Sequence, residues 1–113
     1  MSDSYNRVNA VLKAATLTDD VTLIEYMKTT QLTIQAYNAT GDPIPVDPSI
    51  TVTVTPRLVG NPQGDAHAAI TLGAGVNADS TLENKFLESM EITATAIPAS
   101  TDKVVITVMQ SVY

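Results

Sequence analysis

The stretch from Ile50 to Thr55 reads ITVTVT, an unbroken alternation of branched apolar and hydroxylated side chains. Successive side chains on a β-strand point to opposite faces, so this stretch predicts a strand with one apolar face and one polar face. The same period of two returns at residues 32–36, 90–96 and 104–108. We therefore expect an all-β protein.

Turn-forming residues separate the segments that carry a strand signal. Residues 38–48 contain Gly41 and three prolines, residues 60–64 contain Asn61-Pro62, and residues 73–79 are rich in Gly and Ala. Residues 98–102 form a short polar loop, which predicts an antiparallel hairpin between the last two strands. The expected strands are residues 21–26, 31–38, 50–59, 68–72, 89–97 and 103–113.

Short strands without intervening helices favour a single small antiparallel β-sandwich or an open barrel. The 113 residues suffice for one core. Only 4% of the residues are aromatic and none is Trp, so the core must be thin. We therefore expect neighbouring subunits to cover part of the apolar surface in a homo-oligomer, either a trimer or a dimer. The side chains expected inside are Ile50, Val52, Val54, Val104, Ile106 and Val108, and their alternates Thr51, Thr53, Val105, Thr107 and Met109 suit an interface or a second sheet.

The spacing of apolar residues in residues 1–20 differs from that in the rest of the chain. Ser4 could cap a short helix with apolar side chains on one face, but Val8, Ala10 and Leu12 also alternate as in an extended arm. We expect residues 1–20 to form an N-terminal arm or short helix and residues 21–113 to form the β-sandwich domain. A first sandwich strand is the alternative. The arm is expected to contact a partner through Tyr5, Val8, Val11, Leu12 and Leu17.

The charge pattern argues against nucleic acid as a partner. Six basic and twelve acidic residues give a net charge of -6, and the basic residues are scattered singly, whereas phosphate backbones are bound by clustered Lys and Arg. The chain begins without the basic and apolar regions of a secretion signal, and its apolar stretches are too short for a membrane helix. We expect no membrane partner and synthesis in a host cytoplasm.

Candidate chemistry is sparse. His67, the only histidine, follows Asp65 in a Gly-Pro loop and is expected to be solvated, because a triad also needs a nucleophile placed beside it. The loop carboxylates Asp42 and Asp47, with Asp19 and Asp20, match no calcium-loop spacing and are better interpreted as turn residues. We expect no catalytic residue, no metal site and no cofactor, and hence no enzyme.

Four segments carry a resemblance to a known class of proteins. Residues 25–35 read EYMKTTQLTIQ, residues 51–60 read TVTVTPRLVG, residues 87–96 read LESMEITATA, and residues 104–110 read VVITVMQ. Together they resemble the small β-sandwich proteins and modules that decorate the heads or tails of tailed bacteriophages. The resemblance spans roughly residues 21–113 and transfers no functional residue.

This resemblance implies a structural protein of the virion. The expectation is a capsid decoration (cement) protein that binds the outer surface of the major capsid protein lattice and stabilises it. Such a protein needs a β body and a strand edge or arm that clasps neighbouring subunits. A receptor- or carbohydrate-binding β-sandwich of a tail fibre or adhesin is one alternative, which the shortage of aromatic residues disfavours. A tail or neck adaptor is another.

Overall fold

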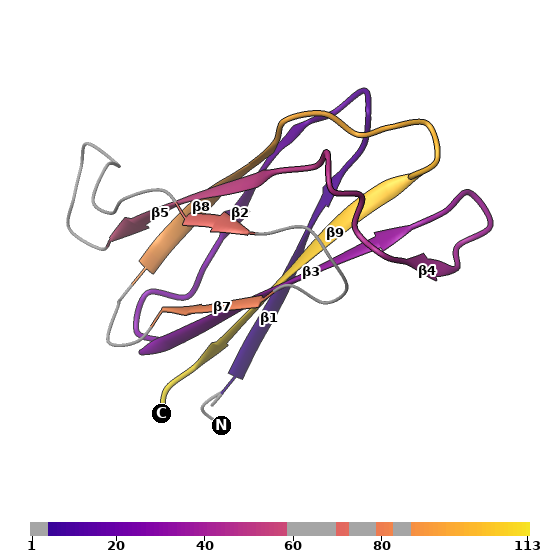
Figure 1. Cartoon of the computed structure of the whole chain (residues 1–113). Helices are drawn as coiled ribbons and strands as arrows, with labels where there is room; N and C mark the ends of the chain where they lie inside the picture. Colours follow the sequence, from indigo (N-terminus) through magenta and orange to yellow (C-terminus); the bar gives the residue numbers. More distant parts are fainter. Residues whose placement is uncertain (1–4, 59–69, 73–78, 83–86) are drawn as a thin grey trace.

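The computed structural model describes residues 5–58, 70–72, 79–82 and 87–113, with side chains for residues 5–57 and 87–113. Two antiparallel β-sheets face each other (Figure 1), and the described residues contain no helix. The strands are β1 (Tyr5–Leu12), β2 (Thr18–Thr22), β3 (Thr29–Tyr37), β4 (Pro43–Ile44), β5 (Val52–Leu58), β6 (Ile70–Leu72), β7 (Asp79–Leu82), β8 (Leu87–Ala94) and β9 (Lys103–Ser111). The all-β, antiparallel sandwich expected from the sequence is confirmed.

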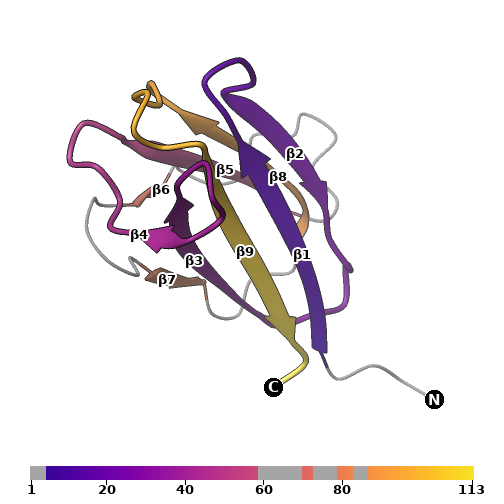
Figure 2. The same ribbon diagram turned by 90° about the vertical axis from the view of Figure 1, so that its right-hand side faces the viewer.

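The first sheet, here called sheet I, has the order β1-β9-β3, and β4 and β7 pair with separate halves of the far side of β3. The second sheet, sheet II, has the order β2-β8-β5-β6. A tight turn, closed by backbone hydrogen bonds between Lys13 and Thr16, joins β1 to β2. The two strands belong to different sheets. They therefore lie along the same side of the sandwich (Figure 2).

Level rows of apolar side chains build the core between the sheets. In sheet I, Ala10 lies opposite Ile106, which lies opposite Ile34, and all three are fully buried. Sheet II presents Val52, Val54 and Ile92 from the other side. The six side chains predicted to be internal, Ile50, Val52, Val54, Val104, Ile106 and Val108, are all buried. The period-two pattern thus predicted correctly which face of each strand points inward.

The N-terminal segment differs from the expectation. Its described part, residues 5–20, forms neither an arm nor a helix, because residues 5–12 pair with β9 along their whole length, from Tyr5 opposite Ser111 to Leu12 opposite Val104. The expected boundary between residues 20 and 21 falls inside β2. The physical reason is the alternation of Val8, Ala10 and Leu12, which supplies the inner face of an edge strand. The alternative of a first sandwich strand is the one that the structure shows.

The strand boundaries contain further corrections. Residues 23–26, expected in a strand, lie in the connection to β3, and β4 and β7 were not expected at all. The predicted hairpin across residues 98–102 is wrong, because β8 belongs to sheet II and β9 to sheet I. This short loop crosses between the layers. Pro56 lies in β5 beyond the residues that pair with β6, so its missing N–H breaks no described ladder.

A buried glutamine fixes the connection between the two sheets. Gln110 is fully buried, and its Nε2 donates to the Ile24 carbonyl at 3.1 Å while its Oε1 accepts from the Ile24 N–H at 3.0 Å. The same Oε1 accepts from Asn6 Nδ2 at 2.8 Å. The Gln110 amide thus makes the two hydrogen bonds with Ile24, in the segment between β2 and β3, that the backbone of a neighbouring strand would otherwise make.

Replacing Leu12 with Ala tests whether β1 belongs to the core. We expect Leu12→Ala to lower the free energy of unfolding by about 2–5 kcal/mol, because it leaves a cavity between the sheets. The neighbouring Val11→Ala is the matched control, since Val11 points outward, and should cost less than about 1 kcal/mol. Urea titration followed by circular dichroism measures both. Equal effects would mean that β1 does not pack as described.

Replacing Gln110 tests the buried amide. Gln110→Ala leaves the Ile24 N–H and carbonyl without partners, so we expect a loss of about 2–4 kcal/mol in unfolding free energy. Gln31→Ala is the control, because Gln31 is an exposed glutamine on β3. The same denaturant titration compares the two variants, and a Gln110→Ala protein as stable as Gln31→Ala would contradict the role given to the amide.

Candidate functional site

The outer face of sheet I is the most apolar exposed surface of the described residues. Its positions alternate with the buried ones on β1, β9 and β3. They are Tyr5, Arg7, Asn9, Val11, Lys103, Val105, Thr107, Met109, Ser111, Thr29, Gln31, Thr33, Gln35 and Tyr37. No carboxylate is among these positions, although the chain carries a net charge of -6. The outward positions of these three strands therefore offer apolar, hydroxylated and amide side chains with two cations.

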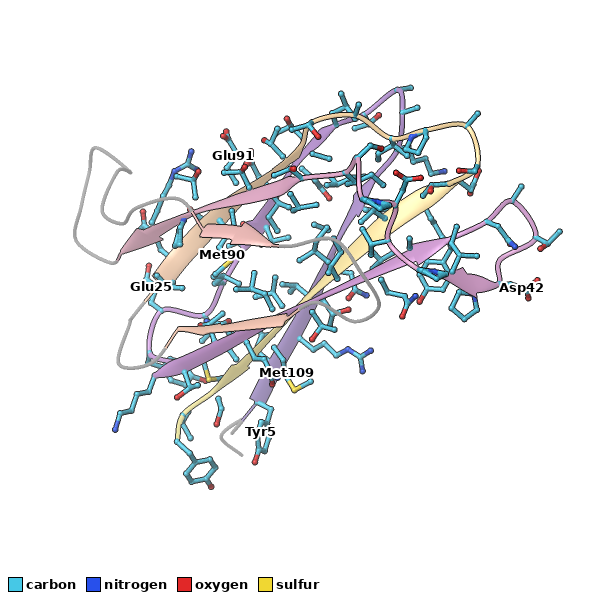
Figure 3. All side chains as sticks on the ribbon, in the orientation of Figure 1. Tyr5, Glu25, Asp42, Met90, Glu91 and Met109 are labelled. Atoms are coloured by element: carbon cyan, nitrogen blue, oxygen red, sulfur yellow. The ribbon has the colours of Figure 1, made fainter. Side chains whose placement is uncertain are left out.

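Large apolar side chains are exposed at one end of this face. Tyr5 is 62% exposed and Met109 41%, and Tyr113 just beyond β9 is 73% exposed. Val11, 39% exposed, lies opposite Val105 towards the other end of the face. The rings of Tyr5 and Tyr113 meet at 6.2 Å between centroids with a 51° tilt. Figure 3 shows Tyr5 and Met109 on the same side of the sheet. Such a group on a small protein is typical of a surface that binds another molecule.

The two cations of this face lie at opposite ends. Arg7 stands level with Met109 and Gln31 across the three strands. Lys103 is opposite Tyr37, and its Nζ lies 5.4 Å from the centre of the Tyr37 ring in a cation–π contact. The tyrosine therefore holds Lys103, whereas no ion pair holds Arg7 among the described residues.

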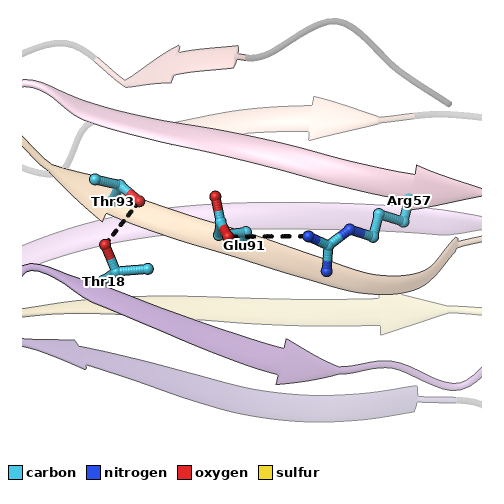
Figure 4. Close-up of polar contacts among 4 residues, drawn as sticks. All are labelled: Thr18, Arg57, Glu91 and Thr93. Atoms are coloured by element: carbon cyan, nitrogen blue, oxygen red, sulfur yellow. Dashed lines mark hydrogen bonds and ion pairs between the residues drawn. The ribbon is translucent and has the colours of Figure 1, made fainter. Parts of the chain in front are cut away.

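The outer face of sheet II is more polar. Thr18 and Thr93 share a hydrogen bond of 3.1 Å between their hydroxyls, and Arg57 lies 3.9 Å from Glu91 (Figure 4). Both partners of that ion pair are partly exposed, so it contributes little to stability. Asp20 stands opposite Glu91 on β2 and is exposed. The two outer faces of the sandwich thus differ in charge and in apolar character.

The side of the sandwich formed by β1 and β2 carries backbone groups that no described strand pairs. The Val11 N–H turns away from β9 and donates to Asp19 Oδ2 at 3.2 Å. Because alternate residues of an antiparallel strand direct their N–H and C=O to the same side, those of Tyr5, Arg7 and Asn9 also point away from β9. Asp19 is an inward-pointing charge that blocks this edge at Val11, near the turn between β1 and β2.

The residues predicted to contact a partner are divided by the structure. Tyr5 and Val11 are exposed on sheet I, Val8 and Leu17 pack partly buried against the core, and Leu12 is fully buried in it. Leu12 is therefore not available to a partner. Met109, which the sequence only suggested for an interface or a second sheet, and Tyr113, which was not expected to contact a partner, lie on the same end of sheet I as Tyr5. Assigning residues 5–12 to a strand next to β9 would have revealed this group.

The loop carboxylates have local partners. Asp42 Oδ2 accepts from the Thr40 hydroxyl at 3.0 Å, and Asp47 Oδ1 accepts from the N–H and the hydroxyl of Ser49 at 2.9 and 2.7 Å. The backbone N–H of Ser49, and then its hydroxyl, hold the pKa of Asp47 below its ordinary value. His67 lies outside the described residues.

Within the described ranges, no group of three or more His, Cys, Asp or Glu side chains is placed to hold a metal ion, and no pocket opens. The same residues contain no helix that is long and apolar enough to span a membrane.

Comparison with known proteins finds no matching family model and no matching curated protein. Among solved structures, the pre-peptidase C-terminal domain of a Bacillus anthracis collagenase is 12% identical, with a TM-score of 0.52 over 91% of this chain and 87% of that one. This likeness shows the fold alone.

Two further solved structures are similar at lower TM-scores. Bacillus endospore appendages, which form disulfide-linked pili, give 18% identity and a TM-score of 0.48 over 96% of this chain and 88% of that one. The Drosophila NLP core, described for pentamer formation and histone binding, gives 14% and 0.46 over 95% and 96%.

Replacing Asp19 tests its contact with the β1 edge. In Asp19→Ala the Val11 N–H loses its acceptor, so we expect its hydrogen exchange to become several-fold faster while that of Ala10, on the β9 side, stays unchanged. Asp19→Asn keeps an acceptor oxygen and should retain most of the protection. Amide exchange followed by NMR measures this, and identical exchange at Val11 in Asp19→Ala and the parent would contradict the contact.

Proposed function

We propose that this protein is a non-enzymatic structural protein of a tailed bacteriophage virion, a decoration (cement) protein bound to the outer surface of the major capsid protein lattice. The outer face of sheet I is the attachment surface. The observation that carries the proposal is the exposed apolar group of Tyr5, Met109 and Tyr113, beside outward positions of β1, β9 and β3 that carry no carboxylate. The phage setting comes from the sequence resemblance.

The energetics of this surface suit attachment to a repeating lattice. Burying exposed apolar area contributes about 25 cal/mol per Å², so a few exposed side chains give a modest affinity for each copy. Many copies held on one lattice convert a modest contact into firm attachment, because each bound neighbour raises the effective concentration. A protein with this small patch can therefore attach firmly when many copies bind to the same lattice.

The charge of the face indicates what it can meet. Arg7 and Lys103 are the only charges at the outward positions of β1, β9 and β3, so a neutral or acidic region of the coat protein can approach these three strands without repulsion. On sheet II, by contrast, Asp20 and Glu91 face outward. We therefore expect sheet I to face the lattice and sheet II to face away from it.

Binding to particles that lack the protein tests this function. Met109→Glu puts a carboxylate beside the exposed rings of Tyr5 and Tyr113, and we expect it to reduce the bound copies per particle by at least about tenfold without changing the circular dichroism spectrum. Thr53→Glu, at an outward position of sheet II, is the control and should bind normally. Cosedimentation counts the copies, and electron cryomicroscopy locates them.

Two outcomes would contradict the proposal. Equal binding by both variants would remove sheet I as the attachment surface, and copies found at the neck or the fibre tip would replace the decoration function with that of an adaptor or a receptor-binding protein.

One observation favours carbohydrate binding as the second candidate. Tyr5 and Tyr113 present two exposed rings side by side, and sugars stack on aromatic faces. Saturation-transfer NMR with bacterial surface glycans distinguishes this function, because sugar signals should respond to the parent chain and not to Tyr113→Ala.

A further inference from the structure

Two tyrosine rings meet where the first and the last strand of sheet I lie side by side. Tyr5 begins β1 and stands opposite Ser111 of β9, and Tyr113 follows Ser111 by two residues. Tyr5 and Tyr113 are therefore diagonal neighbours across the two strands, a separation that aromatic side chains can span. Their ring centroids are 6.2 Å apart.

Hydrogen bonds hold the backbone of both tyrosines. Tyr5 belongs to the ladder between β1 and β9. The Tyr113 N–H donates to Ser111 Oγ at 3.1 Å, and the Tyr113 main-chain oxygen accepts from the Thr29 hydroxyl at 2.6 Å. The rings themselves are mostly exposed, so they can turn about their side-chain bonds and meet dissolved reagents. Two phenols are thus kept together at the surface.

The other tyrosines of the chain do not form such a pair. All four tyrosines lie among the residues described with side chains, and Tyr5 with Tyr113 is the one tyrosine pair in contact among them. Tyr37 contacts Lys103 instead. Tyr26 is 56% exposed in the connection before β3. Exposure is therefore shared by other tyrosines, but proximity to a second phenol is not.

We propose that Tyr5 and Tyr113 are the site of an oxidative cross-link, a dityrosine, formed by a one-electron oxidant such as a haem peroxidase supplied with hydrogen peroxide. The new carbon–carbon bond joins the ring carbons that lie beside the two hydroxyls. This modification does not depend on the proposed function.

The chemistry balances with one peroxide for each cross-link. Each phenol loses one electron and one proton, and the two phenoxyl radicals join through the new bond. The hydrogen on each joined carbon then moves to the neighbouring oxygen, which restores both aromatic rings and both hydroxyls. The two electrons and two protons released reduce one hydrogen peroxide to two waters.

The cross-link fastens the weakest side of sheet I. In the described ladders β1 is an edge strand that pairs with β9 alone, so its first residues are the ones that separate most easily. The bond closes a loop from Tyr5 to Tyr113 and restricts the unfolded chain, as a disulfide does. A chain that contains no cysteine gains a covalent closure in this way.

Oxidation of the full chain tests the proposal. At micromolar protein, peroxidase with hydrogen peroxide should give dityrosine fluorescence in a product that runs as a monomer in denaturing electrophoresis. The yield should not fall on dilution, because both rings belong to one chain. Trypsin cuts after Arg7 and Lys103, so mass spectrometry should find residues 1–7 joined to residues 104–113 with two hydrogen atoms lost.

Matched substitutions locate the bond. Tyr5→Phe and Tyr113→Phe each keep the ring and remove one phenol, and each should reduce the monomeric dityrosine signal at least about tenfold. Tyr26→Phe removes an exposed tyrosine outside the pair and should leave the signal unchanged. Fluorescence found only in covalent dimers overturns the proposal. So does an equal loss of signal in Tyr26→Phe.

Oxidation of Met109 needs its own control, because this side chain is exposed on the same face. Peroxide without peroxidase should convert its thioether to the sulfoxide and leave the tyrosines unlinked. Dityrosine formed equally well without the peroxidase would contradict the one-electron route.

Unfolding tests the closure of sheet I. The cross-linked monomer should unfold at a urea concentration roughly 1–2 M higher than the parent, because the unfolded chain is restricted by a long loop. Tyr5→Phe treated with the same reagents is the control and should show no such rise. A cross-linked monomer that unfolds at the same urea concentration as the parent overturns the closure.

Discussion

Sheet I depends on the pairing of β9 with two strands at once. β1 and β3 both follow β9 along its whole length in unbroken antiparallel register, and the three inner faces bury level rows of side chains. This pairing places Val104, Ile106 and Val108 at the centre of the core. The pairing also determines which side chains lie on the outer face, because the residues on either side of a buried one along a strand point outward. The apolar group around Met109 therefore follows from the same register that builds the core.

The sequence could predict the inner and outer faces because alternation is a local property. The residues of β5 and β9 expected to be internal are buried, since period two states directly which side chains share a face. Which strands become neighbours depends on long-range pairing, and local patterns do not encode it. The loop at residues 98–102 is as short as a hairpin loop, yet it joins two layers.

The candidate surface was harder to predict for the same reason. Residues 5–12 carry helix-like and strand-like spacing together, and only the pairing with β9 decides between them. Once that pairing is known, Tyr5 falls beside Tyr113 and Arg7 beside Met109, although about a hundred positions separate them in the chain. Gln110 gives no local signal either, because its partners Asn6 and Ile24 come from distant segments.

The pairing of the first strand with the last has a consequence for synthesis. Asn6 and Gln110 are 104 residues apart, and β9 is the strand that both β1 and β3 need. During translation these two strands emerge early and must wait, with their apolar sides unpartnered, until the C-terminal strand leaves the ribosome. Contacts this distant in sequence also slow the search for the native state, into the range of milliseconds to seconds typical of β-sandwiches. Folding of sheet I can therefore be completed only after β9 has left the ribosome.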